Sequence, residues 1–448
     1  MATYLYVGLT LLATVIASRK WRAGVAWAIA VGVLQDPIRK LTPGAPAIMA
    51  LSSLPVWAAL MLKLRITERE TWRRLRTDCP SVARRMAVFV VLLLPAAAVA
   101  FQYGLGAWRL VVIGTLGYIA PLLGIFMGFA YVDRADRLRS LLVFYCVVTS
   151  AMMAGSLCEY AGVLASWPAI GTEALGMKWL RYPSAGGVFE MISGFYRSPD
   201  IMGWHAAALT MLSLTLAVAG GGRAVKWLPS AVLGAVCVLI SGRRKMIVMP
   251  AVWLGIVAAG YLRAGRTSRV SMVAGIAGLT LVGLNVAAGQ IAIRSDYYEY
   301  AGSAREETAG RMWISAWADL WATLAQRGIL GAGLGTASQG TQHVMEEIQG
   351  SPRSWQESGL SKILIELGLP GFLCALALAA AIGRALLQSL GLFDARQDTL
   401  LVGVVGFCVA NAAAFIVSHQ VYGDLLVMTL TAFFIGVALA ARRWLPVK

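Results

Sequence analysis

The chain of 448 residues is 58% hydrophobic and only 14% charged, with a mean hydropathy of +0.70. This composition excludes a soluble globular domain and indicates a polytopic membrane protein. The formal net charge of +17 is explained by basic loops on one side of a membrane, so it requires no nucleic acid as a partner.

Apolar runs long enough to cross a hydrocarbon core of roughly 30 Å recur along the whole chain. We expect an all-α bundle of about 12 to 13 transmembrane helices, which forms a single transmembrane domain over residues 1–448. The expected spans are 2–18, 23–35, 45–62, 86–102, 109–131, 141–158, 200–219, 225–241, 246–262, 270–290, 362–383, 399–417 and 424–441.

The connections between these spans alternate between rich and poor in lysine and arginine. Rich connections include the loop from Lys63 to Arg85, residues 263–269 and the C-terminal tail, and the positive-inside rule places them in the cytoplasm. We therefore expect the N-terminus on the external side of the membrane and the C-terminus in the cytoplasm. The two longest connections, 159–199 and 291–361, are then external loops.

The larger external loop is expected to contain a short helical cap. The run RMWISAWADLWATLAQ at 311–326 spaces its apolar side chains mostly at intervals of three and four, which predicts a helix across the mouth of the bundle. Its tryptophans either lie in the membrane interface or pack against the bundle, and we favour the packed arrangement.

No cofactor or metal is expected. The six cysteines fall mostly in apolar spans, the chain has no CxxC pair, and its three histidines are scattered, so neither a disulfide framework nor a zinc site is indicated. The glycines of GAGLG at 331–335 lack the preceding strand and the lysine of a phosphate-binding loop. They predict a flexible or tightly turned loop.

Three consecutive cations, Arg243, Arg244 and Lys245, occupy the turn between two apolar helices on the external side, where the positive-inside rule disfavours them. With Arg311, at the head of the cap helix, they are expected to form a cationic pocket at the membrane surface. Guanidinium groups bind phosphate oxygens bidentately, so a diphosphate is the expected ligand. The alternative is a solvated turn whose charges reach lipid headgroups.

The order of four segments resembles the superfamily of O-antigen ligases and O-antigen polymerases, which are membrane glycosyltransferases that use polyprenyl-diphosphate-linked glycans. GFYRSPDIMGWHAAALTML at 194–212 is similar to the family's aromatic-Arg-x-Pro entry to a helix, and LISGRRKMIV at 239–248 resembles its Ser-x-Arg turn. The run from 310 to 336 resembles its Arg, Trp and Gly-x-Gly-x-Gly segment, and 357–373 resembles its closing signature. The N-terminal half is similar only in hydropathy.

The resemblance implies an enzyme of the bacterial inner (cytoplasmic) membrane, with its N-terminus in the periplasm and its C-terminus in the cytoplasm. The enzyme would transfer or polymerise undecaprenyl-diphosphate-linked oligosaccharide repeat units on the external face of that membrane, and polymerisation is the preferred form. Its partners would be this donor, a glycan or lipid acceptor, and the bilayer. The donor carries its own leaving group, so the transfer requires no nucleotide and no metal. An O-antigen ligase that transfers the glycan to lipid A core or another acceptor is the first alternative, and a lipid-linked sugar flippase or transporter is the second.

The expected catalytic residues are Glu357, Arg311 and Arg243. Glu357 is the first candidate for the base that takes the proton of the acceptor hydroxyl, and a solvated acid or an ion-pair partner is its alternative role. Ligases of the superfamily commonly have a histidine at this point of the closing signature, so Glu357 favours a polymerase. His343 is the alternative base, although an exposed loop position is the favoured interpretation of that residue.

Further residues are expected to bind the diphosphate or the glycan. The resemblance assigns phosphate binding to Arg243 or Arg244 and to Arg311, and it gives Arg197 a matching motif position. His205 is a candidate because ionisable residues inside a membrane are often functional, but it alternatively bonds a neighbour. Asp200 is expected to cap a helix. The substrate-binding set is Arg244, Lys245, Arg197, His343, Arg305, Arg353 and His205.

Overall fold

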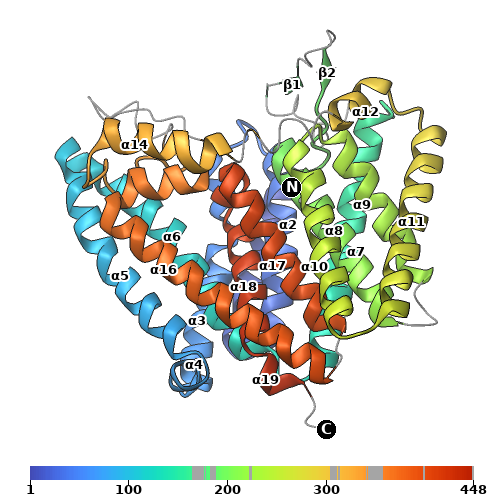
Figure 1. The fold of residues 1–448 in the computed structure, drawn as a ribbon. Coiled ribbons are helices and arrows are strands. Elements are labelled where there is room, and N and C mark those ends of the chain that lie inside the picture. The colour runs from blue at the N-terminus through green and yellow to red at the C-terminus, as the bar shows by residue number, and fades with distance from the viewer. Residues whose placement is uncertain are drawn as a thin grey trace.

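The computed structural model describes residues 1–163, 176, 178–181, 188–220, 225–302, 310, 313–339, 341, 357–396 and 399–445. Over these residues the protein is a helical bundle, which confirms the predicted all-α class (Figure 1). The described β-structure is one antiparallel pair, in which β1 (Leu180–Arg181) pairs with β2 (Phe189–Glu190).

Helices follow one another closely along the chain. The long helices are α1 (Ala2–Arg19), α2 (Trp21–Leu41), α3 (Leu54–Thr67), α5 (Pro80–Ala100), α6 (Trp108–Tyr131), α7 (Ala135–Tyr160), α8 (Pro199–Gly220), α9 (Leu228–Ile240), α10 (Arg244–Arg263), α11 (Thr267–Gln290), α16 (Gly359–Arg396), α17 (Thr399–Val417) and α18 (Leu425–Leu439). The shorter helices are η1 (Ala47–Leu51), α4 (Thr71–Asp78), η2 (Phe101–Tyr103), η3 (Leu105–Ala107), α12 (Ser295–Gly302), η6 (Ile314–Ala318), α14 (Asp319–Arg327), η7 (Gln420–Gly423) and α19 (Ala441–Trp444).

Every predicted span contains a helix. In the described part of the chain, ten helices are long and apolar enough to cross a membrane. The other three predicted spans correspond to α9 and α18, which are apolar but shorter, and to α2, which carries Asp36 and Lys40. The chain is therefore a polytopic helical membrane protein.

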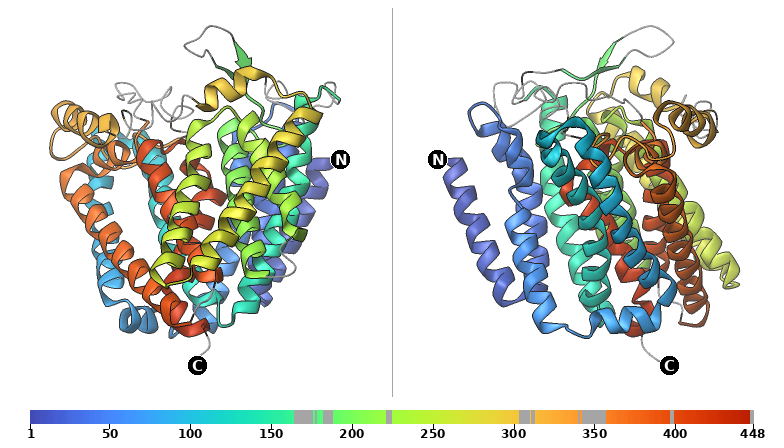
Figure 2. Two further views of the ribbon diagram at one scale, coloured as in Figure 1. Left: turned by 45° about the vertical axis from the view of Figure 1, so that its right-hand side comes forward. Right: turned by 90° about the vertical axis from the view of Figure 1, so that its left-hand side faces the viewer.

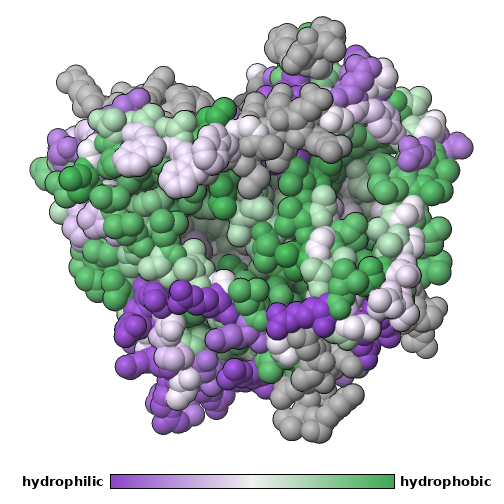
Figure 3. Space-filling view, in the orientation of Figure 1, coloured by the Kyte–Doolittle hydropathy of each residue, from purple (hydrophilic) through white to green (hydrophobic). Residues whose placement is uncertain are grey.

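The two ends of the bundle differ in composition. β1, β2, α12 and α14 gather at one end, called the loop end here, and α4 and α19 lie at the other (Figures 1 and 2). Figure 3 shows an apolar belt between the ends and a strongly hydrophilic band at the end that carries α4. This belt is the surface expected to contact lipid tails.

Helix α8 forms the centre of the bundle. All of its residues from Pro199 to Val218 are buried, and it contacts α7, α9, α10 and α17. A Cβ at Gly234 of α9 would lie 2.8 Å from the carbonyl oxygen of Ala206, so this glycine allows the two helices to approach closely. At the loop end, the N-terminal end of α8 therefore lies among the start of α10 and the C-terminal ends of α7, α9 and α17.

The segment GAGLG forms the tightly turned loop that its glycines predict. Gly331, Gly333 and Gly335 all have positive φ angles, and a Cβ at Gly335 would lie 2.0 Å from the carbonyl oxygen of Leu110. The loop packs against Gly368, where the backbone of α16 is kinked with φ of +63°. Buried Glu366 accepts hydrogen bonds from the backbone N–H of Ala337 at 3.0 Å and also pairs with Lys362, which fixes the first turns of α16.

The helical cap exists as η6 followed by α14, but its tryptophans are not packed against the bundle. The side chains of Trp313, Trp317 and Trp321 are 69%, 54% and 65% exposed. The favoured expectation of a packed arrangement is therefore wrong, because the buried face of α14 is formed instead by residues around Thr323.

Candidate functional site

The turn between α9 and α10 is packed inside the protein. Gly242 has φ of +60°, and a Cβ there would lie 2.8 Å from the ring of Phe189. The N–H of Ile192 donates to the carbonyl oxygen of Ile240 at 3.2 Å. Because the segment that contains β2 covers this turn, Arg243 is only 8% exposed, and a solvated turn is not what the structure contains.

Asp200 holds two of the three cations. Its carboxylate lies 2.7 Å from the guanidinium of Arg243 and 2.8 Å from the ammonium of Lys245. Lys245 also donates to the hydroxyl of Ser418 at 2.9 Å. Asp200 was expected to cap α8, and its two ion pairs instead connect the start of α8 to the start of α10.

Aromatic rings cover the other side of the cation cluster. The guanidinium carbon of Arg244 lies 3.8 Å from the ring centre of Tyr300 on α12, and that of Arg243 lies 5.4 Å from the ring centre of Trp179. Both distances are within the range of cation–π attraction. Parts of the connections between α7 and α8 and between α11 and α16 thus converge on the α9–α10 turn.

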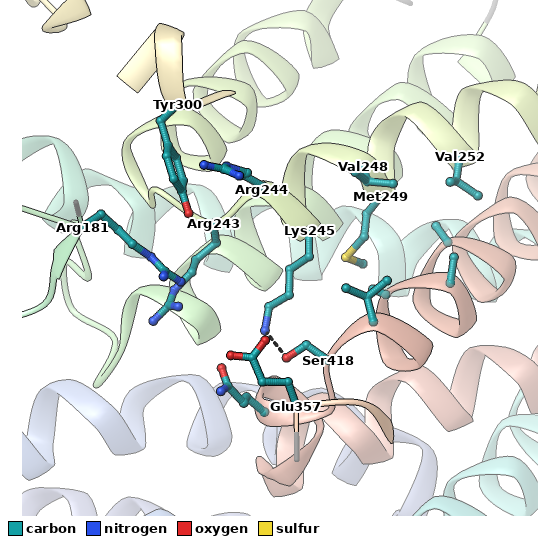
Figure 4. A pocket seen from close by; sticks show the side chains of 15 residues that line it. Arg181, Arg243, Arg244, Lys245, Val248, Met249, Val252, Tyr300, Glu357 and Ser418 are labelled. Atoms are coloured by element: carbon teal, nitrogen blue, oxygen red, sulfur yellow. Dashed lines mark hydrogen bonds between the residues drawn. The ribbon is translucent and has the colours of Figure 1, made fainter. Parts of the chain in front are cut away.

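A cavity of about 140 Å³ opens beside these residues (Figure 4). One end is polar and carries cations from α10 and β1, whereas the other end is an apolar slot between α10 and α17. Its lining consists of Arg181, Arg243, Arg244, Lys245, Val248, Met249, Val252, Tyr300, Glu357, Ala410, Ala413, Ala414, Val417, Ser418 and Gln420.

The polar end has more positive than negative charge among the described residues. Four cations line it, and the nearby carboxylates are those of Asp200 and Glu357. The Nε atoms of Arg181 and Arg243 are buried and have no hydrogen-bond partner in the described part of the chain. Burial and the neighbouring Arg181 lower the pKa of the Arg243 guanidinium, and Asp200 opposes them. A bound anion would relieve this excess charge.

Glu357 extends into the same cavity from the start of α16. Figure 4 shows its carboxylate directed toward the side chains of Lys245 and Ser418. Its backbone carbonyl oxygen accepts from the N–H of His419 at 2.8 Å and lies 3.1 Å from the Nδ1 of the same histidine. The structure thus places four of the predicted site residues, Glu357, Arg243, Arg244 and Lys245, around one cavity.

Arg181 and His419 are among the residues of this site that were not found from the sequence. Arg181 reaches the cavity because the β1–β2 pair folds back over the bundle. His419 is 6% exposed beside Glu357; burial and Lys362 lower its pKa to about 4, so it is neutral near pH 7. The one available signal for His419 was its place at the loop end of an apolar run.

Arg197 and His205 do not line the cavity. Arg197 pairs with Asp36 at 2.9 Å and with Asp424 at 2.6 Å; burial would lower its pKa, but the two carboxylates raise it. His205 is buried in α8, where its Nδ1 lies 2.8 Å from the hydroxyl of Tyr145. This contact matches the alternative interpretation of His205 as a residue that bonds a neighbour.

Four other predicted site residues, Arg305, Arg311, His343 and Arg353, lie outside the described residues. Among the residues that are described, no group of three or more histidine, cysteine, aspartate or glutamate side chains could hold a metal ion.

The chain matches no protein-family model and no curated protein sequence.

The ion pairs of Asp200 predict an anion-dependent stability. The Asp200→Asn variant is expected to have a lower thermal unfolding midpoint in detergent, because loss of one partner from a buried ion pair costs about 3–5 kcal/mol. Inorganic pyrophosphate should raise the midpoint more in this variant than in the wild type, since the anion replaces the missing charge. The Asp296→Asn variant is a matched control, because its partly exposed pair with Arg294 contributes only about 0–1 kcal/mol. Equal midpoints for the two variants would contradict this role of Asp200.

Proposed function

We propose that this protein is a metal-independent glycosyltransferase that uses a polyprenyl-diphosphate-linked oligosaccharide as donor, with the O-antigen ligase and polymerase superfamily as its family. The observation that carries the proposal is the form of the cavity, in which a cluster of cations adjoins an apolar slot. A donor with a diphosphate next to a long hydrocarbon chain has the same two parts in the same order.

The polar end suits a diphosphate. Guanidinium groups offer pairs of parallel N–H donors to phosphate oxygens, and Arg181 and Arg243 each have a buried Nε without a protein partner among the described residues. The surrounding protein excludes much of the water, so each charge contact is stronger than it would be in solution. Tyr300 and Trp179 stack on the arginines and keep them extended.

The apolar end suits an isoprenoid chain. Val248, Met249 and Val252 lie on one face of α10. The opposing face of α17 is lined at intervals of three and four by small residues, which leave room for a hydrocarbon chain between the helices: Ala410, Ala413, Ala414 and Val417. A free nucleotide or inorganic phosphate would leave this slot empty.

Glycosyl transfer can then proceed with the residues of the cavity. The acceptor hydroxyl oxygen attacks the anomeric carbon as the bond between that carbon and the diphosphate oxygen breaks. Glu357 takes the hydroxyl proton, and Arg243 and Arg244 stabilise the negative charge that develops on the leaving diphosphate. Polyprenyl diphosphate leaves with the electron pair of the broken bond.

A repeat-unit polymerase on the periplasmic face of the bacterial inner membrane is the preferred form of this activity, because Glu357 stands where related ligases commonly have a histidine. One observation supports a ligase as the second candidate: His419, from a distant segment, contacts the backbone of Glu357. A flippase is less well supported, because the described cavity cations gather at the loop end and not through the depth of the bundle.

Loss of Arg243 or Arg244 at the polar end should strongly reduce transfer. Arg243→Ala and Arg244→Ala are each expected to lower the rate about 10²-fold or more, the usual effect of removing a group that stabilises developing charge. Arg243→Lys should recover little activity, because lysine lacks the bidentate fork. The assay is release of polyprenyl diphosphate by purified protein without nucleotide or metal. Arg294→Ala, outside the cavity, is the control, and full activity of both cavity variants would refute the assignment.

Replacement of Glu357 tests the base separately from diphosphate binding. Glu357→Gln is expected to lower the turnover number about 10²-fold to 10⁴-fold while the donor concentration at half-maximal rate changes little, because glutamine keeps the shape but cannot accept the proton. Glu299→Gln, an exposed site on α12, serves as the control. Unchanged turnover in Glu357→Gln would move the role of base to His343.

A further inference from the structure

The consecutive helices η6 and α14 lie across the loop end, transverse to the spanning helices (Figures 1 and 2). α14 packs on α16, and η6 contacts both α16 and α17. The face of α14 toward α16 is marked by Thr323, which is 1% exposed. One face of this pair of helices is therefore packed against α16 and α17.

The opposite face carries three tryptophans at intervals of four residues, called the tryptophan stripe here. Trp313, Trp317 and Trp321 are more than half exposed, and the ring centres of the first two are 6.2 Å apart. Ile314 beside them is 51% exposed. A surface helix that faced only water would instead have charged and polar residues on this side.

The stripe is located near the edge of the apolar belt. The turn from α5 to α6, at the same end of the bundle, exposes Leu105 by 87% and Trp108 by 56%. It is joined to the segment after α14 because the side-chain amide of Gln102 donates to the carbonyl oxygen of Ala332 at 3.0 Å. Ile329 in that segment is 63% exposed. The apolar and aromatic surface thus continues from the spanning helices onto the transverse helix.

We propose that the tryptophan stripe is inserted in the headgroup interface of the bilayer, so that η6 and α14 form an interfacial helix lying in the plane of the membrane. Tryptophan concentrates at this depth because its ring is apolar and its indole N–H finds water or headgroup oxygens, and transverse helices with one such face bind there. The bilayer then fixes the depth of two adjoining parts of the protein relative to the membrane. These are the GAGLG loop at 331–335, which packs against Gly368, and the start of α16. The inference stands independently of the proposed chemistry.

Tryptophan fluorescence in proteoliposomes tests this placement. The emission of a Trp313→Phe, Trp317→Phe, Trp321→Phe variant, subtracted from that of the wild type, isolates three of the 15 tryptophans. We expect this difference signal to lose roughly half of its intensity or more in phosphatidylcholine brominated near the headgroup end of its acyl chains, because interfacial rings contact those atoms. Aqueous iodide should quench it much less.

The control is Trp57→Phe, which removes a tryptophan that is 5% exposed, and its difference signal should respond to neither quencher. Quenching of the stripe by iodide alone would overturn the proposal, because the tryptophans would then face water. A stripe signal insensitive to both quenchers would also overturn it and would point to contact with a second copy of the chain. If the triple variant does not insert, Trp317→Phe alone allows the same comparison.

Discussion

The rest of the site depends on the ion pairs that the buried carboxylate of Asp200 forms with Arg243 and Lys245. Arg243, Arg244 and Lys245 stand at the N-terminal end of α10, where the helix dipole already favours negative charge and disfavours cations. Their mutual repulsion in a buried place would be costly without a nearby anion. Asp200, in the first turn of α8, supplies one negative charge to two of them. The remaining excess of positive charge is the basis for proposing an anionic ligand in the cavity.

Asp200 stays in that position because the segment before it is fixed by ion pairs and hydrogen bonds to neighbouring helices. Arg197 joins Asp36 of α2 to Asp424 at the start of α18, and Glu159 of α7 accepts the backbone N–H groups of Ser193 and Gly194. These contacts tie the entrance of α8 to three other helices. Arg197 therefore acts on the cavity through the position of Asp200, at a distance from any ligand. The arginine of the GFYRSP segment at 194–199 thus stabilises the structure in front of α8.

The spans were predictable because lipid contact requires long apolar runs, which are local in the sequence. Arg243, Arg244 and Lys245 could be singled out because three cations in that turn oppose the positive-inside bias. Two other residues were not predictable: Arg181, which lines the cavity, and His419, which contacts the backbone of Glu357. Both lie on segments that are distant from Arg243 along the chain. The partners of Asp200 could not be found either, since a helix-start aspartate has the same local pattern whether it caps or forms ion pairs. Exposure of the cap tryptophans depends on which helix face meets α16. Apolar spacing alone could not decide whether the tryptophans pack against the bundle or lie in the membrane interface.

The proposed glycosyl transfer can be observed as turnover by the purified protein. A polyprenyl-diphosphate oligosaccharide is supplied without nucleotide or metal, and the products are resolved by mass. We expect a ladder of glycans that differ by one repeat unit, together with released polyprenyl diphosphate. A single transfer to an added lipid acceptor would retain the donor chemistry but replace polymerase with ligase. Movement of intact donor across vesicles without any cleavage of the diphosphate bond would contradict the account.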